Sequence, residues 1–226
     1  MKKLLFLNIF VVVSTIQLLA QNITIGTGTA ASYLYGPYYR SSATSTFNNS
    51  NYAYIYTPDE LTAIPPGSLI TAVEWQKAAG TITAPNTFQI FMENNSATVL
   101  NTGTTWGTLT ASATNVYNNT SQGFTVPAPG WESFNLTTPF TYTGGTLQIC
   151  IKHVKQGTAS GANNYYYTSV PGKAIGRASN LAGSNATTLS TANYGNNRPN
   201  IRITYAQNSP CSGTPAPGNT ISTGSV

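Results

Sequence analysis

The apolar side chains of this chain alternate with polar ones in short runs, a pattern typical of β-strands with one buried face. The three tyrosines of residues 51–57, for example, alternate with Ala53 and Ile55. The same period of two recurs in residues 22–28, 68–77, 87–93, 131–136, 146–154, 163–169, 172–179 and 198–205. Gly, Pro and Asn separate these runs and favour turns. The pattern predicts about nine or ten strands.

Within each run, the alternation predicts which side chains face the core. In residues 68–77 it places Leu69, Thr71, Val73 and Trp75 on one face, opposite Ile70, Ala72 and Glu74. In residues 146–154 it places Leu147, Ile149 and Ile151 together, so Cys150 points away from the main core. The runs 163–169 and 172–179 look like neighbouring strands of one hairpin, joined by the turn residues Val170-Pro171-Gly172.

Helix signals are nearly absent from the chain. The segment TPDEL is the exception, since Thr57 is placed to cap a single helical turn with Pro58 at its first position. Many short strands without helical crossovers predict an all-β fold, an antiparallel β-sandwich that is jelly-roll-like.

The chain divides into three parts. Residues 1–20 have two lysines followed by an apolar run and are predicted to be a secretory signal peptide. Residues 21–205 form the β-sandwich domain, and residues 206–226 are a linker rich in Pro, Gly, Ser and Thr or the start of another module. No later segment is long enough to cross a membrane as a helix, so we expect a secreted or cell-surface protein.

Composition excludes one class of partner. Only 7% of residues are charged, and the formal net charge of +5 includes Lys2 and Lys3 of the predicted signal peptide. The remaining cationic residues are scattered along the chain. Nucleic-acid binding, which needs a basic patch, is therefore not expected.

The sequence contains few side chains that could act as catalytic groups. A Ser-His-Asp arrangement would need the single histidine, His153, which we expect to be a strand-end residue that is solvated or locally hydrogen-bonded. A glycosidase needs two carboxylates, and Glu74 and Glu93 are candidates because both lie on polar strand faces that could converge across a sheet. Ordinary solvent-facing acids are the favoured interpretation, so we expect no enzymatic activity.

Metal and cofactor sites are not expected either, with one alternative left open. Zinc needs three or four closely spaced ligands, which this chain lacks. Calcium binding at Asp59-Glu60, the one pair of adjacent acids, remains an alternative. Cys150 and Cys211 are the two cysteines, and export permits a disulfide between them that would tie the linker to the sheet.

Two tyrosine-rich stretches are candidate ligand sites, because sugars bind aromatic faces flanked by amides and hydroxyls. The first comprises Tyr165, Tyr166 and Tyr167 beside Asn163 and Asn164, with an aromatic edge strand as the alternative. The second is YLYGPYYR, residues 33–40, where Tyr35 and Tyr38 could bind a ligand. The interpretation favoured there is a turn whose rings pack inward, since Gly36-Pro37 precedes the strand at residues 51–57.

Several motifs together resemble a known module. The segments TIGTGT, YLYGPYYR, YAYIYTPDEL, SLITAVEWQK, PAPGWESFNLTTPFTYTGG and RPNIRITY cover most of residues 22–205. They resemble the N-terminal β-sandwich module of large secreted or cell-surface proteins of Bacteroidetes-type bacteria. The motifs are structural rather than catalytic.

The resemblance implies a non-catalytic module of an exported, adhesin-like protein that acts in binding or as a structural cap. Surface glycans or proteins are its expected partners, and the alternative is a carbohydrate-binding accessory domain of a secreted hydrolase. Look-alikes often continue into further repeats and a sorting domain for type IX secretion. No such domain is visible before Val226, so we expect a fragment of a longer protein or a truncated gene product.

Overall fold

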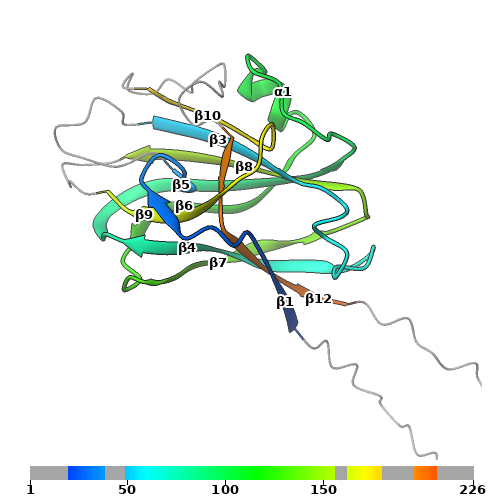
Figure 1. Ribbon diagram of the computed structural model, residues 1–226, viewed down its shortest axis with the longest axis horizontal. Coiled ribbons are helices and arrows are strands. Elements are labelled where there is room, and N and C mark those ends of the chain that lie inside the picture. Colours follow the sequence, from blue (N-terminus) through cyan, green and yellow to red (C-terminus); the bar gives the residue numbers. More distant parts are fainter. Residues whose placement is uncertain (1–19, 39–48, 156–161, 180–195, 208–226) are drawn as a thin grey trace, which may run out of the picture.

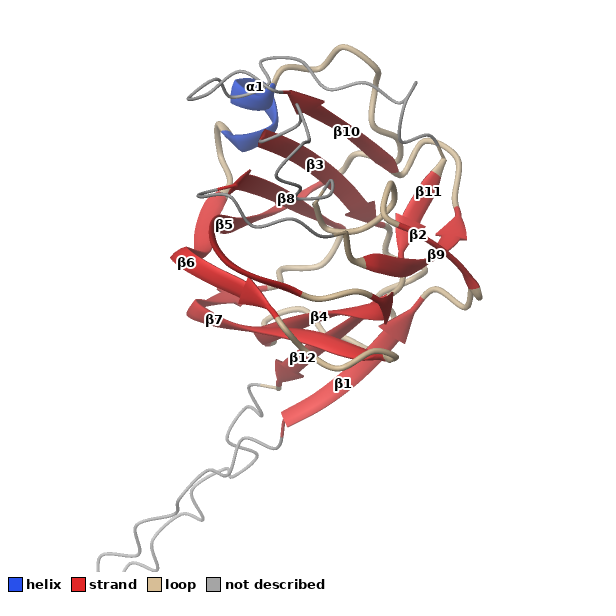
Figure 2. Cartoon of the chain, turned by 90° about the vertical axis from the view of Figure 1, so that its left-hand side faces the viewer, coloured by secondary structure: helices blue, strands red, loops and turns tan. Residues whose placement is uncertain are grey.

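The computed structural model describes residues 20–38, 49–155, 162–179 and 196–207, and within them the fold is almost entirely antiparallel β-structure (Figures 1 and 2). The strands are β1 (Ala20–Ile25), β2 (Ala30–Ser32), β3 (Asn49–Tyr56), β4 (Leu69–Ala79), β5 (Ile82–Asn95), β6 (Thr114–Phe124), β7 (Gly130–Thr141), β8 (Thr146–Lys155), β9 (Asn164–Ser169), β10 (Ala174–Ser179), β11 (Asn197–Pro199) and β12 (Ile201–Ala206). One short helix, α1 (Trp106–Thr110), completes these elements. The predicted signal peptide and linker lie almost wholly outside the described residues.

The strands form two sheets. The seven-stranded sheet has the order β1-β12-β4-β9-β11, with β2 paired to β9 and β7 paired to β4. The five-stranded sheet has the order β10-β3-β8-β5-β6. Strands from the two ends of the chain meet, because β1 pairs with β12 from Ala20 opposite Ala206 to Ile25 opposite Ile201 (Figure 1).

The main hydrophobic core lies between the two sheets. Trp75 of β4 meets Phe88 of β5 with ring centroids 6.4 Å apart, so aromatic side chains from opposite sheets are in contact. Most strands contribute alternate residues to this core, as the period of two predicts. The side chains predicted to share a face do so within this core, namely Tyr52, Tyr54 and Tyr56 of β3, Phe88, Ile90 and Met92 of β5, and Leu147, Ile149 and Ile151 of β8. The predicted inward direction of Ile201 and Ile203 of β12 is confirmed.

A second, smaller hydrophobic cluster lies on the outer side of the five-stranded sheet, where α1 packs (Figure 2). Trp106 and Leu109 of α1 pack against a face of the sheet that includes Ala53, Ile55 and Cys150. Thr105 caps the helix by accepting a hydrogen bond from the Thr108 backbone N–H at 3.1 Å. This arrangement explains why β3 is buried on both faces.

The structure corrects two predictions, the alternation along β4 and the hairpin formed by residues 163–169 and 172–179. The pairing of β4 with β7 shifts between Ile70 and Ala72, which places Ile70 in the core while Thr71 is only partly buried. This bulge breaks the alternation predicted for residues 68–77. The predicted hairpin of residues 163–169 and 172–179 is also wrong, because β9 and β10 belong to different sheets.

The predicted helical turn at TPDEL is a pair of hydrogen-bonded turns instead. The backbone N–H of Glu60 donates to the Thr57 carbonyl at 2.9 Å, and that of Leu61 donates to the Pro58 carbonyl at 3.1 Å. The described residues contain more strands than the predicted nine or ten, partly because β2 and β11 are only three residues long. The other addition, β6, is rich in Asn and Thr and lies at a sheet edge, where few apolar positions are needed.

Candidate functional site

The outer face of the seven-stranded sheet carries a group of polar side chains around one tryptophan. Strand pairing aligns Gln76 of β4 with Trp131 of β7 and aligns Glu74 with Ser133 on one side and Arg202 on the other. The core side chains of these strands point the opposite way, so these five side chains share the solvent side. We call Trp131, Arg202, Glu74, Gln76 and Ser133 the outer-face group.

Arg202 occupies the centre of the outer-face group. Its guanidinium carbon lies 4.7 Å from the ring centroid of Trp131, a cation–π contact. Its Nε donates to Glu74 Oε2, and this hydrogen bond raises the pKa of Arg202 above its ordinary value. Trp131, Arg202 and Glu74 are all only partly buried. The arrangement therefore places a partly exposed indole, a cation and a carboxylate side by side on three adjacent strands.

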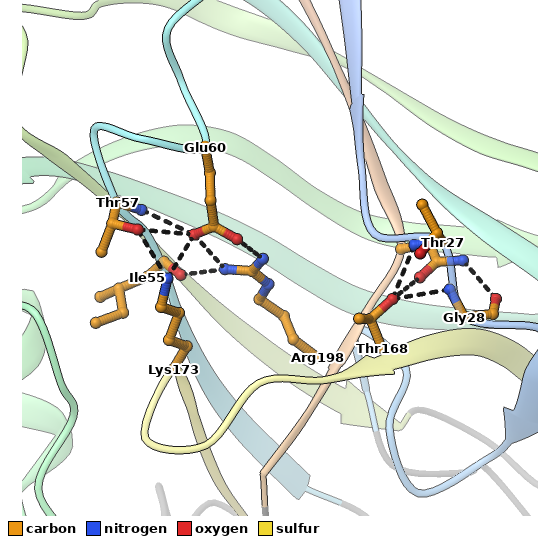
Figure 3. Close-up of polar contacts among 9 residues, drawn as sticks. Thr27, Gly28, Ile55, Thr57, Glu60, Thr168, Lys173 and Arg198 are labelled. Atoms are coloured by element: carbon orange, nitrogen blue, oxygen red, sulfur yellow. Dashed lines mark hydrogen bonds and ion pairs between the residues drawn. The ribbon is translucent and has the colours of Figure 1, made fainter.

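A hydrogen-bonded network supports the Gln76 edge of the outer-face group. Asn200 donates from Nδ2 to Gln76 Oε1 and to the Gly28 carbonyl, both at 2.8 Å. Thr168 Oγ1 donates to Asn200 Oδ1 at 2.8 Å and accepts from the backbone N–H groups of Thr27 and Gly28 (Figure 3). This network holds the TIGTGT segment against β9 and the start of β12.

Glycines allow the close approach in this network. A Cβ on Gly28 would lie 1.6 Å from the Tyr167 carbonyl oxygen, so no larger residue fits there without moving the backbone. Gly26 has a φ of +98°, which L-residues rarely adopt. The glycines of TIGTGT are therefore explained by packing.

A second polar network ties the TPDEL turns to β11. Arg198 pairs with Glu60 and donates to the Ile55 carbonyl, while its guanidinium carbon lies 4.1 Å from the Tyr56 ring centroid. Lys173 Nζ adds a 3.1 Å ion pair to Glu60 and a 2.7 Å hydrogen bond to Thr57 Oγ1 (Figure 3). Burial alone would raise the pKa of Glu60, but these partners lower it to about 2. The carboxylate is therefore fully engaged in a structural ion-pair network.

Calcium at Asp59-Glu60 would have to compete with this network. A calcium ion would need the Glu60 oxygens that Arg198 and Lys173 already hold. Among the described residues, no group of three His, Cys, Asp or Glu side chains comes together.

The candidate ligand residues divide by burial. Tyr38, Tyr165 and Asn163 are almost fully buried, and the hydroxyls of the two tyrosines lie 3.4 Å apart. Buried side chains of this kind offer no surface to a ligand. Tyr166, Tyr167, Asn164 and Tyr35 are partly buried. Of these, Tyr35 and Tyr167 contact one another edge to face, with centroids 4.5 Å apart.

The described part of YLYGPYYR, residues 33–38, is anchored by the tyrosines of β3. Tyr54 Oη donates to the Gly36 carbonyl at 2.6 Å, and Tyr52 Oη donates to the Leu34 carbonyl at 3.3 Å. A Cβ on Gly36 would lie 2.4 Å from the Tyr165 ring. These contacts support the prediction that the stretch is an inward-packed turn. Tyr39 and Arg40 lie outside the described residues.

The candidate catalytic groups are separated or buried. Glu74 lies on the outer side of one sheet, whereas Glu93 lies on the outer side of the other, where it accepts from Gln148 Nε2 at 3.2 Å. The hypothesis that these carboxylates converge is therefore wrong.

His153 is buried rather than solvated at a strand end. Its Nε2 lies 3.1 Å from Asn86 Oδ1 and its Nδ1 lies 3.5 Å from Ser50 Oγ, so the expected local hydrogen bonding is present. Its alternation with Ile149 and Ile151 indicates this inward direction. Burial, with a contribution from Lys155, lowers the pKa of His153 to about 3.

Cys150 is buried in the cluster beneath α1 and has no disulfide partner among the described residues. The prediction that it points away from the main core is confirmed. Burial raises the pKa of this thiol well above its ordinary value. Cys211 lies outside the described residues, so the disulfide between the two cysteines stays a prediction.

The sequence reasoning missed Trp131, Arg202 and Gln76 as candidate binding residues. The signal was present, because the alternation that buries Phe134 and Leu136 also turns Trp131, Ser133 and Asn135 outward. What the sequence lacks is the pairing of β4 with both β7 and β12, of which the second brings together Glu74 and Arg202, 128 positions apart.

Comparison with known proteins shows no family. No family model and no curated protein matches the chain. Among solved structures, one match is the crystal structure of the cysteine protease and lectin-like domains of Cwp84, a surface-layer-associated protein of Clostridium difficile. The TM-score is 0.43 at 9% sequence identity, and the match covers 70% of this chain and 32% of that chain. This chain thus spans about a third of that protein's length, and a similarity at this level does not identify a function.

In the described residues, no helix has the length and apolar character that a membrane span needs.

Proposed function

We propose that this chain is a non-catalytic binding module of an exported surface protein, with the outer-face group as its carbohydrate-binding site. The observation that carries the proposal is the partly exposed Trp131 with Arg202 and Glu74 beside it on an open sheet face. In this proposal the two sheets form the sandwich expected from the sequence, and export follows from the predicted signal peptide.

The chemistry of the outer-face group suits a sugar. An indole face is a large apolar platform with low conformational entropy, on which the C–H face of a pyranose ring packs. Carboxylate, guanidinium, amide and hydroxyl groups together offer both donors and acceptors to sugar hydroxyls. Ser133 and Asn135 extend the exposed polar surface along β7 beyond Trp131. Tyr35 and Tyr167, by comparison, lie edge to face against one another.

The ion pairs and positions of the described glutamates favour a binding role over hydrolysis. Glu60, Glu74 and Glu132 are each in an ion pair with a cationic side chain. A glycosidase needs one carboxylate and one carboxylic acid facing each other across a sugar. The fourth glutamate, Glu93, lies on the outer side of the other sheet. The same site would serve an adhesin or an accessory domain of a hydrolase.

The test is a glycan-array screen of the wild-type protein and of Trp131→Ala. We expect wild-type binding to a subset of glycans and at least a tenfold loss in Trp131→Ala, consistent with loss of apolar burial worth about 1.5–3 kcal/mol. Trp131→Phe keeps an aromatic face and should retain part of the binding.

Tyr166→Ala is the comparison variant for the tyrosine-rich strand β9. If glycan binding falls in Tyr166→Ala but is unchanged in Trp131→Ala, the site lies on β9 and the outer-face group is the wrong assignment. A wild-type protein that binds no glycan on the array would overturn the carbohydrate proposal. Circular dichroism of each variant checks that the fold is retained.

A further inference from the structure

Three side chains that ordinarily avoid a protein interior meet at one end of the core. Lys77 of β4, Glu132 of β7 and Asn163, immediately before β9, have exposed fractions of 0%, 3% and 1%. Lys77 and Glu132 belong to strands of the same sheet, in which β4 pairs with β7 on one side and with β9, directly after Asn163, on the other. The surrounding side chains are mainly aromatic, including Tyr38, whose ring lies 4.2 Å from that of Phe124.

The amino group of Lys77 is held by two acceptors. Its Nζ lies 2.9 Å from Glu132 Oε2 and 2.9 Å from the Phe124 carbonyl oxygen. Burial raises the pKa of Glu132, although the hydrogen bond and charge of Lys77 oppose this effect. A buried carboxylate beside a buried amine is therefore placed to accept the proton of that amine.

The amide of Asn163 lies next to the same carbonyl. Its Nδ2 donates to Phe124 O at 3.4 Å and to Tyr38 Oη at 2.6 Å, so the amide and the Lys77 amine share an acceptor. Its Oδ1 is buried and has no hydrogen-bond partner. An unsatisfied buried oxygen carries a free-energy penalty, so this amide is only partly stabilised in its present form.

We propose that Lys77 and Asn163 form an intramolecular isopeptide bond, with Glu132 as the group that moves the protons. The Lys77 amine contacts a proton acceptor, Glu132, and shares the Phe124 carbonyl with the Asn163 amide, in a site closed to water. Such proximity replaces a collision between reactants with a local rearrangement of side chains. Exclusion of water also protects the product from hydrolysis.

The reaction needs no external reagent. The Lys77 ammonium transfers a proton to the Glu132 carboxylate, and the neutral Nζ uses its lone pair to form a bond to Cγ of Asn163. The bond from Cγ to Nδ2 then breaks, and Nδ2 takes up the proton lost by Nζ and the proton held by Glu132. The products are a Lys77–Asn163 amide, an ammonium ion and the regenerated Glu132 carboxylate, so atoms and charge balance.

The bond would add a covalent link between β4 and β9 to their short stretch of backbone pairing. The two strands pair at only two positions, Lys77 with Tyr165 and Ala79 with Asn164. A cross-link at this point closes a long loop of the chain and so reduces the conformational entropy of the unfolded state. Such a link suits a surface module that must resist unfolding, and it is independent of the proposed glycan site.

The test is the intact mass of the folded wild-type protein, measured after denaturation and reduction and compared with the mass calculated from its determined N-terminus. We expect a mass lower by one ammonia molecule, and a tryptic peptide in which Lys77 is joined to Asn163. Glu132→Gln, Lys77→Met and Asn163→Ala should each have the full sequence mass. Asn164→Ala and Lys152→Met, matched neighbours outside the cluster, should keep the wild-type loss.

A wild-type mass equal to the sequence mass would overturn the proposal, and this measurement does not depend on any variant folding. A loss of water instead of ammonia would also contradict it, since that identifies a carboxylate as the partner of the amine. Persistence of the loss in Asn163→Ala would show that the bond lies elsewhere.

Discussion

The ion-pair network at Glu60 predicts a pH-dependent stability that a single substitution removes. In Glu60→Gln the side chain keeps its shape but loses its charge, and Arg198, which is 3% exposed, loses its anionic partner. Arg198 keeps its hydrogen bond to the Ile55 carbonyl and its contact with the Tyr56 ring. The guanidinium is therefore only partly compensated in the variant.

The magnitude follows from the pKa of Glu60. Its folded pKa of about 2 lies below the ordinary value of 4.5. At about 1.4 kcal/mol per pKa unit, this difference is equivalent to roughly 3 kcal/mol of stability. Because the Glu60 side chain is 17% exposed and that of Lys173 is 22% exposed, solvent screening reduces the value. We expect Glu60→Gln to lower the free energy of unfolding by about 2 kcal/mol at pH 7.

The sign of the pH dependence is fixed by the direction of the shift. A depressed folded pKa means that the unfolded state binds the proton more tightly, so the stabilisation is present above pH 4.5 and decreases as pH falls toward 2. Urea denaturation of wild type and Glu60→Gln at pH 7, 5 and 3 measures this. The difference between the two proteins should be nearly the same at pH 7 and pH 5 and clearly smaller at pH 3.

Glu93→Gln is the matched control. Burial raises the pKa of Glu93, and its side chain accepts a hydrogen bond from neutral Gln148, so it lacks the stabilising ion pair. At neutral pH, Glu93→Gln should therefore lower the free energy of unfolding by less than Glu60→Gln does. An equal loss of stability for Glu60→Gln at pH 7 and pH 3 would refute the electrostatic explanation.

Three further predictions concern single side chains. Tyr35→Ala should lower the melting temperature, because it removes the edge-to-face contact with Tyr167; an unchanged melting temperature with lost ligand binding would favour a recognition role. Burial keeps the Cys150 thiol protonated and inaccessible, so it should not react with a maleimide in the native state and should react fully in urea. Rapid labelling of the native protein would contradict the placement of Cys150 beneath α1. The imidazole NMR signals of His153 should not titrate between pH 8 and 5, because its pKa of about 3 lies below the ordinary 6.5. Since this depressed pKa favours protonation of the unfolded state, the contribution of His153 to stability decreases below about pH 6.5. A titration midpoint near 6.5 by NMR would refute the burial of His153.

The all-β character and most core faces could be predicted from the sequence, because alternation is a local property. Ile201, Ile203 and the tyrosines of β3 follow the period of two without interruption. The prediction failed at Thr71, where a bulge inserts a residue that the pattern does not show. It also failed at β9 and β10, since nothing local indicates that the chain changes sheets at the turn between them.

The candidate sites were harder to predict because they depend on pairing between distant strands. Lys77 and Glu132 continue the buried faces of Trp75 and Phe134, yet their charge suggests exposure. Only the pairing of β4 with β7 shows that the two charges neutralise each other inside the core. Tyr165 and Tyr38 were attractive as ligand residues for their ring chemistry, but their rings fill the core instead.

The motifs behind the family resemblance have structural explanations in the described residues. TIGTGT and RPNIRITY meet where Gly28 accepts from Asn200, and YIYTPDEL meets RPNIRITY where Glu60 pairs with Arg198. YLYGP is bound by the hydroxyls of Tyr52 and Tyr54. These motifs thus fix connections between separate segments of the chain.

The most direct test of the proposed binding site uses the fluorescence of Trp131. Trp75 and Trp106 are buried, so Trp131 is the tryptophan most accessible to an added sugar. The wild-type protein is titrated with soluble cello-, xylo-, manno- and chito-hexaoses while emission and acrylamide quenching are recorded. We expect a saturable change with at least one oligosaccharide, with reduced quenching, and no change in Trp131→Ala. A saturable change that persists in Trp131→Ala, or no change with any of the four sugars, would contradict it.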